Sequence, residues 1–580
     1  MAAWDEAVDF LVAGSGAAGM TAALRAHDLG AATLVIEKAP VYGGSTALSG
    51  GVVWVPNNPF MRQHGLSDSP EEGLRYIEAV TAGSTGTQRL RAYIDGAPRM
   101  LATLAERSHV RFACLPDYPD YYPELAGGKP GGRSCEPLLF DALQLGEEFR
   151  RQRQAPLEKQ VMGGRLAIGV ADGHALLTGG LRAAVFMARG LLAYYTNLRA
   201  RWRKLGNTDL TLGAALAGRL RLSLLERQVP LWLETPIKEI LTEDGRVVGA
   251  RVERAGQLLR IQARQGVLLA AGGFEHNAKM RQHYQPSPIG NQWTAGCDSN
   301  LGDTVVLGTA VGASLDLMDD AWWCPAMLSP ASQTAPVYIV IFEKNLPGSI
   351  IVDARGRRFM NEAAPYNDVV KSMYKANATG APAIPAFLIF DSRFRKKYPC
   401  GPMPPGYATP DRLLPKTLAG NFFVKADSIE ALAHKIGVDA DGLRETVARL
   451  KQSAAAGTDP DFHRGESLQD RYYTAKATGP NPNLGPIERP PFYAVRVYPG
   501  DLGTKGGFRT DAQARVLSVT GDVIPGLYAA GNSSATVMGR TYPGAGATIG
   551  PAMTFGFLAA EDAASTGRKP LPPDQAGNRL

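Results

Sequence analysis

The segment GRTYPGAGATIGPA, which begins at Gly539, places a single tyrosine in a run of glycine, alanine and proline. Glycine lets a ligand approach the main chain closely because it carries no side chain. Tyr542 brings one phenolic hydroxyl into this run, and a phenol can donate a hydrogen bond or take part in acid–base chemistry. The segment therefore predicts a small binding cradle that contains one hydroxyl.

The N-terminal residues predict a dinucleotide-binding turn. Residues 9–13 form an apolar strand pattern, residues 18–28 an Ala-rich helical pattern, and ATLVIEK a second strand that ends at Glu37, with GxGxxG between the first two. Such glycines allow a tight turn and let a pyrophosphate sit at the helix N-terminus, while the acid after the second strand binds ribose hydroxyls. The alternative is a structural glycine turn without a ligand. We expect these residues at the cofactor: Gly14, Gly16, Ala18, Gly19, Glu37 and Lys38.

Three later glycine-containing segments favour FAD over NAD as the dinucleotide. They are VYGGSTALSGG at 41–51, GVLLAAGGFEHN at 266–277 and GLYAAGN at 526–532. The first follows the acidic strand directly, and it contains no histidine to which a flavin could be covalently linked. Asn532 stands where an aspartate is common, which weakens the prediction at that position. The further residues expected at a non-covalent FAD are Gly44, Ser45, Thr46, Ser49, Gly50, Gly272, Asp303, Gly531 and Asn532.

Composition excludes several other classes of protein. A net charge of +7 over 580 residues is mild, and no basic-aromatic module for nucleic-acid binding is present. The five cysteines include no CxxC pair, and the eight histidines form no HxH or HExxH pair, so neither a disulfide framework nor a metal site is predicted. The N-terminus has no basic region typical of a signal peptide, and no apolar run is long enough to span a bilayer. These features predict a cytoplasmic protein.

The order of these segments predicts an α/β fold with a discontinuous Rossmann-like FAD-binding domain. We expect this domain at 1–320 and 503–580, with an inserted α+β catalytic or cap domain at 321–502, where proline and aromatic residues are more frequent. A small β-meander is predicted at 231–270 and a pair of helices at 428–457. The residues after about 566 read as a loose tail.

Residues 176–206, inside an insertion at about 150–230, read as a basic amphipathic helix. Apolar residues recur at helical spacing, and no acidic residue lies between 173 and 208. A helix of this kind can lie on an anionic membrane surface, although it can also be an ordinary helix with a solvated basic face. The basic residues are Arg182, Arg189, Arg199, Arg201, Arg203 and Lys204.

Ten motifs in this order resemble the FAD-dependent 3-ketosteroid Δ1-dehydrogenases, and the resemblance extends over nearly the whole chain. They are GSGAAGMTAALRA, YGGSTALSGG, WVPNN, DYYPELAGGKPGGRS, GGFEHN, DDAWW, GSIIVDARGRRFMNEAAPY, FHRGE, PGDLGTKGGFRTD and GRTYPGAGATIGPAMTFG. The resemblance implies loss of a proton from carbon 2 of a 3-ketosteroid and of a hydride from carbon 1 to N5 of FAD. It also implies a quinone or similar electron acceptor and a role in steroid degradation.

The resemblance also assigns roles to particular residues. Tyr542 and the backbone N–H of Gly546 would hold the ketone oxygen, Tyr366 would take the proton, and Tyr121, or alternatively Tyr122, would assist it. A Δ4-(5α)-dehydrogenase, a fumarate-reductase-like enone reductase and a flavin-binding protein without steroid turnover are the competing interpretations.

Overall fold

The computed structural model describes residues 3–156, 160–178, 181–202, 205–330, 332, 336–474 and 479–566. Its largest element is an eight-stranded sheet to which both ends of the chain contribute. The order along the sheet is β22-β23-β11-β1-β2-β8, and β10 and β9 extend it from β11. The strands are β1 (Glu6–Ala13), β2 (Thr33–Ile36), β8 (Leu231–Trp232), β9 (Ile237–Glu243), β10 (Arg246–Arg254), β11 (Gln257–Leu269), β22 (Arg515–Leu517) and β23 (Val523–Ala529).

The central strands of this sheet are parallel, as the predicted strand–helix–strand unit requires. β1 pairs in parallel with β2 and β11, and β11 pairs in parallel with β23. The carboxyl-terminal parts of β1 (10–13) and β11 (267–269) are apolar and buried, which is typical of a parallel sheet covered on both faces. The carboxyl ends of β1, β11 and β23 therefore lie side by side, and the glycine-rich segments follow these ends.

The predicted meander at 231–270 is only partly correct. β9, β10 and the first half of β11 pair antiparallel, as a meander requires. However, β11 is a single strand of 13 residues that continues to Leu269 and joins the parallel sheet beside β1. The strand predicted to begin at 266 is thus the last four residues of β11, and no turn separates the meander from the main sheet.

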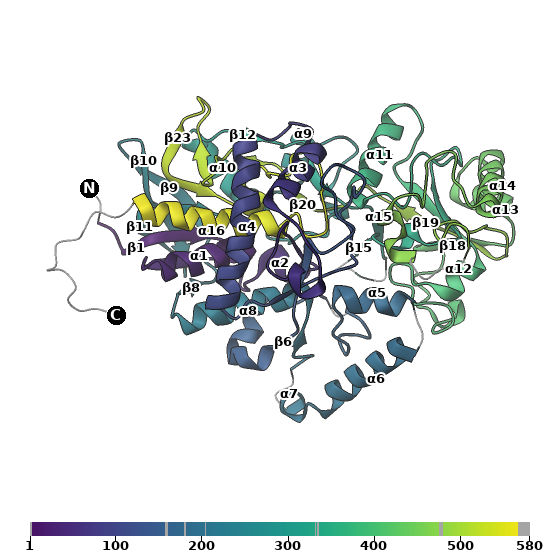
Figure 1. The fold of residues 1–580 in the computed structure, drawn as a ribbon, viewed down its shortest axis with the longest axis horizontal. Coiled ribbons are helices and arrows are strands. Elements are labelled where there is room, and N and C mark those ends of the chain that lie inside the picture. The colour runs from purple at the N-terminus through teal and green to yellow at the C-terminus, as the bar shows by residue number, and fades with distance from the viewer. Residues whose placement is uncertain are drawn as a thin grey trace.

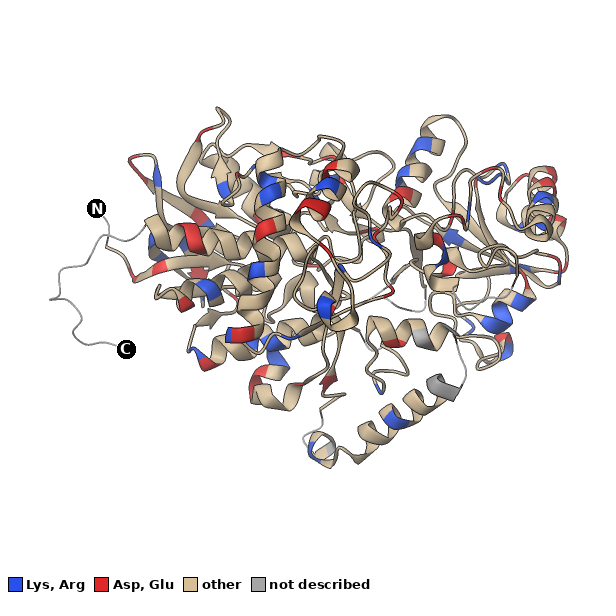
Figure 2. Ribbon diagram, in the orientation of Figure 1, with Lys and Arg blue, Asp and Glu red and all other residues tan. Residues whose placement is uncertain are grey.

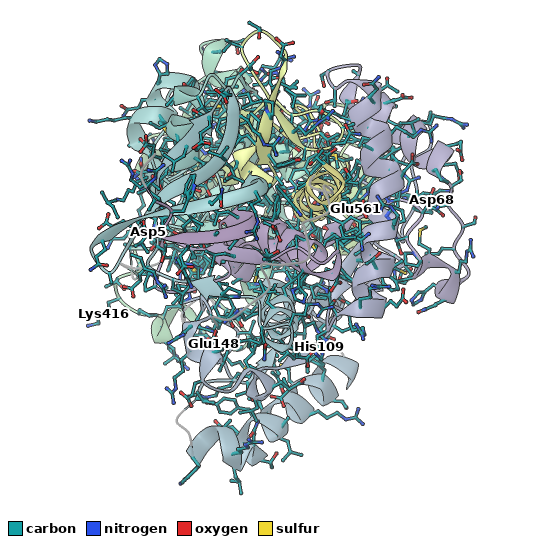
Figure 3. All side chains as sticks on the ribbon, turned by 90° about the vertical axis from the view of Figure 1, so that its left-hand side faces the viewer. Asp5, Asp68, His109, Glu148, Lys416 and Glu561 are labelled. Atoms are coloured by element: carbon teal, nitrogen blue, oxygen red, sulfur yellow. The ribbon has the colours of Figure 1, made fainter. Side chains whose placement is uncertain are left out.

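Helices from the N-terminal and C-terminal parts of the chain pack together on the main sheet. The C-terminal helix α16 (Ile549–Thr566) lies along α1 (Ala17–Asp28), as Figure 1 shows. Glu561 of α16, labelled in Figure 3, accepts hydrogen bonds from Arg25 of α1 and from Arg99 of α4, each at 2.6 Å. The other helices of this half are α2 (Gly44–Leu48), α3 (Pro70–Thr81), α4 (Thr87–Arg107), α8 (Leu212–Glu226), α9 (Ala278–Tyr284) and α10 (Asp303–Ala310).

A four-stranded antiparallel sheet, in the order β16-β17-β19-β18, lies within the segment predicted as the cap. Alternate residues of β17 enter different apolar clusters, Leu388 and Phe390 on one face and Phe387 and Ile389 on the other, so both faces are buried. The predicted helix pair is present as α13 and α14. The elements of this segment are β16 (Ser349–Val352), β17 (Ala386–Phe390), β18 (Phe423–Ala426), β19 (Phe492–Val497), α11 (Tyr366–Ala378), α12 (Ser392–Lys397), α13 (Ile429–Ile436), α14 (Ala440–Ala456) and α15 (Leu468–Arg471).

Short two- and three-stranded sheets connect the two large sheets. β3, β5 and β4 form one of these, and the pairs β6–β7, β12–β21, β13–β20 and β14–β15 form the others. Their strands are β3 (Val53–Trp54), β4 (Phe112–Cys114), β5 (Ser134–Pro137), β6 (Phe140–Asp141), β7 (Asp209–Leu210), β12 (Leu315–Asp316), β13 (Ala321–Trp323), β14 (Ala326–Leu328), β15 (Val337–Ile339), β20 (Asp501–Thr504) and β21 (Gly507–Phe508).

The single helix predicted at 176–206 is wrong, because the structure has three helices here. They are α5 (Val170–Thr178), α6 (Leu181–Thr196) and α7 (Leu198–Trp202), and α6 and α7 form the lower edge of the molecule in Figure 1. Asn197 ends α6, and its side-chain oxygen accepts the backbone N–H of Ala200 at 3.1 Å, so it caps the start of α7. Within the described residues no helix is long and apolar enough to cross a membrane. The predicted tail after 566 lies outside the described residues.

Candidate active site

The predicted glycine turn joins β1 to α1 and requires glycine at two positions. Gly14 has φ of +114°, and an added Cβ would lie 2.3 Å from the carbonyl oxygen of Ala270 on the neighbouring strand segment. At Gly19 an added Cβ would lie 2.0 Å from the carbonyl oxygen of Gly14. Both distances are shorter than any van der Waals contact, so only glycine lets β1, α1 and the end of β11 pack this closely.

Polar groups surround this turn in the arrangement that a dinucleotide needs. The carboxylate of Glu37 accepts hydrogen bonds from the hydroxyl of Ser15 at 2.7 Å and from the backbone N–H of Ala39 at 3.0 Å. Thr46 Oγ1 accepts the N–H of Ala17, in the first turn of α1, at 2.9 Å. An anion and a ribose can replace or extend these contacts at the N-terminus of α1.

Residues 297–303 and Asn532, which follows β23, bring polar side chains from later parts of the chain to this region. Ser45 Oγ accepts hydrogen bonds from Cys297 N and Asn300 Nδ2, both at 3.0 Å. Lys38 and Asp303, both predicted to bind the cofactor, form an ion pair with each other. Asn532 follows β23, and its Oδ1 accepts the indole N–H of Trp322 at 3.1 Å.

One continuous cavity contains nearly all the predicted cofactor residues. Gly19 is the exception: it packs against Gly14 instead, as described above. The cavity also contains the four predicted catalytic residues. The predicted residues that line it are Gly14, Gly16, Ala18, Glu37, Lys38, Gly44, Ser45, Thr46, Ser49, Gly50, Gly272, Asp303, Gly531, Asn532, Tyr121, Tyr366, Tyr542 and Gly546.

Three tyrosines from distant parts of the chain meet in this cavity. The ring centroid of Tyr366 lies 5.2 Å from that of Tyr542 and 5.5 Å from that of Tyr121, and Tyr121 lies 5.4 Å from Tyr542. Tyr366 is the first residue of α11, and Tyr542 lies in the glycine-rich loop before α16. Of the two tyrosines proposed for the assisting role, Tyr121 lines the cavity, whereas the hydroxyl of Tyr122 binds the carboxylate of Asp368 at 2.9 Å.

Hydrogen bonds from the N-terminal half of the chain hold the loop around Tyr542. The carbonyl oxygen of Pro543 accepts the N–H of Tyr121 at 2.9 Å and the hydroxyl of Tyr76 at 2.6 Å. The hydroxyl of Tyr542 lies 3.0 Å from that of Thr548. The segments that carry Tyr121 and Tyr542 are therefore fixed relative to each other.

Burial raises the pKa of all three phenols. Desolvation raises the pKa of Tyr121 and Tyr366 well above its ordinary value, and it raises that of Tyr542 to about 12. For Tyr542 this rise is partly offset by hydrogen bonds with Thr548 and Tyr366, and for Tyr366 by a hydrogen bond with Tyr121. The phenols are neutral at pH 7, so one that accepts a proton must pass on its own.

Two further tyrosines line the cavity without having been predicted. Tyr118 and Tyr473 are within hydrogen-bond distance, with 3.0 Å between their hydroxyl oxygens. Tyr118 lies three residues before Tyr121, so the tyrosine-rich segment DYPDYY was a usable signal for it. Tyr473 has no comparable signal. Its neighbour Tyr472 stacks on Tyr118 with ring centroids 4.2 Å apart and on His174 of α5 at 4.5 Å, which connects the 150–230 insertion to the cavity.

Arg153 is a second residue that the sequence did not indicate. It lines the cavity and donates hydrogen bonds to Asp298 at 3.0 Å and to Ser299 at 3.4 Å. Asp298 is largely exposed, so a buried phosphate could compete with it for the guanidinium. In the described part of the chain, no group of three or more His, Cys, Asp or Glu side chains could hold a metal ion.

Comparison with known proteins agrees with this geometry. A family model described as an FAD binding domain matches residues 9–549. The 3-oxosteroid 1-dehydrogenase of Mycolicibacterium smegmatis is 44% identical over 568 residues, which cover 96% of this chain and 97% of that protein. The chain belongs to the 3-oxosteroid 1-dehydrogenase family of FAD-binding proteins.

Solved structures give the same assignment of fold. The crystal structure of 3-ketosteroid Δ1-dehydrogenase from Sterolibacterium denitrificans, in complex with 1,4-androstadiene-3,17-dione, is 45% identical, with a TM-score of 0.93 over 97% of this chain and 100% of that chain. The 3-ketosteroid Δ4-(5α)-dehydrogenase of Rhodococcus jostii is similar in fold alone, with 23% identity and a TM-score of 0.66 over 97% of this chain and 98% of that chain. The chain is thus more similar in structure to this Δ1-dehydrogenase than to the Δ4-(5α)-dehydrogenase.

The residues present fit FAD. Gly14 and Gly16 of the glycine turn line the cavity, and so does Glu37. The same cavity is also lined by Gly44, Ser45, Thr46, Leu48, Ser49, Gly50, Gly531 and Asn532. This continuity lets one elongated molecule extend from the N-terminus of α1 towards Tyr121, Tyr366 and Tyr542.

Proposed function

We propose that the protein desaturates the bond between carbons 1 and 2 of 3-ketosteroids and passes the electrons to a quinone or similar acceptor. The observation that carries this proposal is the cluster of Tyr121, Tyr366 and Tyr542, whose rings lie 5.2 to 5.5 Å apart in the cavity that contains the glycine turn. A flavin carrier without steroid turnover has no need for three phenols at one end of its cofactor cavity. The apolar side chains of Ile339 and Ile341 in the same cavity suit a steroid.

In this proposal Tyr542 and Gly546 bind the ketone oxygen of the substrate. Removal of the proton from carbon 2 leaves negative charge on this oxygen, and two preorganised donors lower the barrier by stabilising it. The hydroxyl of Tyr542 is one donor. Among the described residues no acceptor takes the backbone N–H of Gly546, which leaves it available as the second.

Tyr366 takes the proton from carbon 2 while its own hydroxyl proton passes to Tyr121, and the hydroxyl proton of Tyr121 leaves in turn through Tyr118 towards solvent. Because burial raises the pKa of Tyr366 well above its ordinary value, a free phenolate is scarce at neutral pH. A hydrogen bond to Tyr121 lets the proton move on as it is taken. When bound, FAD supplies the oxidised ring that accepts the hydride from carbon 1.

The residues assigned to FAD would divide its length between them. Glu37 would bind the ribose, the N-terminus of α1 and Thr46 the pyrophosphate, and Asn532 with its glycine neighbour the part nearer the tyrosines. The same reasoning adds Arg153 as a cation for the phosphates. The division into an FAD-binding domain at 1–320 and 503–580 and a cap at 321–502 is part of the proposal. The parallel sheet and the antiparallel sheet support it.

Anaerobic addition of androst-4-ene-3,17-dione should bleach the visible band of oxidised flavin and give a steroid that has lost two hydrogens at carbons 1 and 2. Mass spectrometry of the steroid and absorption spectroscopy of the flavin measure the two events in one sample. If a saturated 5α-3-ketosteroid bleaches the flavin and the enone does not, the enzyme acts between carbons 4 and 5. If neither steroid bleaches it, the proposed substrate class is wrong.

We also propose that α6 and α7 make a peripheral contact with an anionic membrane surface. Several of the apolar side chains predicted to form one helical face are exposed, and among them Leu192, Leu198 and Trp202 are 65%, 74% and 86% exposed. Along α6, Figure 2 shows blue and tan but no red, because the segment contains no acidic residue. Arg189 and Arg199 are exposed beside these side chains, whereas the side chains of Arg182, Arg201, Arg203 and Lys204 lie outside the described residues.

The protein should float with vesicles that contain anionic phospholipid at low salt, and less with neutral vesicles. Leu198→Ser combined with Trp202→Ser should reduce the bound fraction about tenfold, because apolar insertion and charge attraction both contribute. Val519→Ser is a matched control, since Val519 is 75% exposed on the FAD-binding half. Failure of the unmodified protein to bind anionic vesicles at low salt would contradict the proposal.

A further inference from the structure

Lys505 contacts two residues that adjoin Tyr542, namely Thr541 and Trp322. It is on the turn between β20 and β21, and its side chain is fully buried. Its Nζ donates a hydrogen bond to the carbonyl oxygen of Thr541 at 2.8 Å, and Thr541 immediately precedes Tyr542. The same Nζ lies 4.8 Å from the ring centroid of Trp322, and the Trp322 ring packs edge-on against that of Tyr542 at 4.9 Å.

The buried ammonium of Lys505 has only weak compensation from carboxylates. The nearest carboxylate oxygen, Asp320 Oδ2, is 3.7 Å away, which is longer than a hydrogen bond, and Lys371 shares this oxygen at 3.5 Å. The other oxygen of Asp320 accepts the indole N–H of Trp323 at 2.6 Å. Asp368, the other acid whose charge acts on Lys505, is hydrogen-bonded to Tyr122.

A second buried lysine in the cap segment has a different environment. The Nζ of Lys344 donates to the carbonyl oxygens of Ala364 at 2.6 Å and Glu362 at 2.9 Å, and to Asn345 Oδ1 at 3.1 Å. Three acceptors satisfy the three donors of an ammonium. Among the described residues, Lys505 has one such acceptor and one aromatic ring. A buried charge destabilises the fold unless it is paired and hydrogen-bonded. Because the ammonium of Lys505 is less well satisfied than that of Lys344, this difference indicates an electrostatic role for Lys505.

We propose that Lys505 is a positioning residue for Tyr542. Lys505 holds the Thr541 carbonyl by a hydrogen bond, and it places a positive charge against Trp322. This charge makes the Tyr542 hydroxyl a stronger hydrogen-bond donor to the substrate oxygen. This inference rests on the proposed function, because it requires negative charge to develop at that oxygen. A nearby cation favours the ionised form of a phenol and so makes its O–H a better donor. In a buried site of low dielectric, the field of one charge extends over the 4.8 Å from Lys505 Nζ to the Trp322 ring and the further 4.9 Å to the Tyr542 ring.

The state of charge at neutral pH agrees with this role. Desolvation lowers the pKa of Lys505 to about 8, with Asp320 and Asp368 opposing the change and Lys371 adding to it. The side chain therefore carries its proton at pH 7. The indole of Trp322 also donates to Asn532, so the ring that contacts Lys505 cannot rotate away without breaking that bond.

Equilibrium binding of two steroids to the FAD-loaded protein tests the proposal without turnover. Estradiol has an aromatic ring A with a 3-hydroxyl whose phenolate resembles the charge that develops on the substrate oxygen, and androsta-1,4-diene-3,17-dione is its neutral counterpart. The change in flavin absorption during titration with each steroid would give its Kd. We expect Lys505→Met to weaken estradiol about tenfold or more relative to the dienone, and Lys505→Arg to restore most of the loss.

Two further variants separate charge from packing. Lys505→Gln can retain a donor towards Thr541 without the charge, so it should keep dienone affinity and still lose the preference for estradiol. Lys371→Met removes the half-exposed cation that shares Asp320 and should leave the ratio of the two Kd values within about twofold, since exposed charges are well screened. Equal weakening of both steroids in Lys505→Gln would overturn the proposal.

A measurement on the unmodified protein keeps the test valid if the variants do not fold. The preference for estradiol over the dienone should fall several-fold as the pH rises from 7 to 9, because Lys505, whose pKa is about 8, loses its charge over this range while estradiol remains neutral. A preference that does not change between pH 7 and pH 9 would overturn the role of Lys505 alone. Failure to bind either steroid would overturn the proposed function together with it.

Discussion

Replacement of Tyr366 by phenylalanine should reduce kcat by about three orders of magnitude while FAD remains bound. The substitution removes the one hydroxyl that we assign to proton removal and leaves the ring that packs against Tyr121 and Tyr542. Because the cofactor residues lie on other segments, the flavin spectrum of the variant should match that of the parent. Steady-state kinetics with an artificial electron acceptor and the flavin-to-protein ratio measure the two quantities.

The pH dependence of the parent enzyme gives an independent test of the same role. A base whose pKa is raised is more often in its active, deprotonated form as the pH rises, and burial raises the pKa of Tyr366 well above its ordinary value. The value of kcat/KM should therefore increase from pH 6 towards pH 10 without a plateau near neutrality. In Tyr366→Phe this increase should disappear.

Tyr122→Phe is the matched control for this prediction. Tyr122 lies next to Tyr121 in sequence, but its hydroxyl binds Asp368 outside the cavity, so the variant should lose some stability and less than about threefold in kcat. Comparable losses in Tyr122→Phe and Tyr366→Phe would mean that general loosening, not loss of the base, explains the result. Near-normal turnover in Tyr366→Phe would remove Tyr366 as the base.

The sequence predicted the parts of the site that depend on local structure. The glycine turn could be predicted because strand, glycines, helix and acid are consecutive, and a positive φ at Gly14 has few alternatives to glycine. Tyr542 could be predicted because its neighbours in sequence are also its neighbours at the cavity. Tyr121 and Tyr366 followed from motifs of a known family, since neither is marked by local pattern.

The parts that were missed depend on contacts between distant segments. Tyr473 reaches the cavity only because α15 and the turn after it pack beside Tyr118, more than 350 positions earlier in sequence. Lys505 has an ordinary place in the motif GTKGG, and its burial against Trp322 follows from the pairing of β13 with β20. The break at Asn197 was also missed, because helical periodicity in apolar residues continues across it.

Gly546→Ala should lower kcat/KM about 100-fold or more, with FAD still bound and the protein folded. Gly546 has φ of +97°, and an added Cβ would lie 2.6 Å from the backbone nitrogen of Trp54 and 2.7 Å from the carbonyl carbon of Val52. These are backbone atoms of β3 and the residue before it, and they cannot turn aside as a flexible side chain could. The loop must move, and the N–H of residue 546 moves with it.

Neighbouring contacts confine the expected damage to this loop. The hydroxyl of Ser134 donates to the carbonyl oxygen of Ala545 at 2.9 Å, and the N–H of Gly550 donates to that of Gly546 at 2.9 Å. Movement of the loop weakens both bonds and should cost about 1–3 kcal/mol of unfolding free energy. Because a misplaced donor weakens binding of the developing charge more than binding of the neutral ketone, kcat should fall more than KM rises.

Gly437→Ala is a control variant that introduces backbone strain without steric crowding. Gly437 ends α13 with φ of +73°, but an added Cβ there would meet no atom within 4 Å. This variant should lose a similar part of its stability through strain and retain full kcat/KM. Thermal unfolding and steady-state kinetics on both variants, with flavin content as a check, give the comparison. If Gly546→Ala retains kcat/KM within about threefold of the parent, the backbone N–H at 546 does not bind the ketone oxygen, and Tyr542 alone must stabilise the charge.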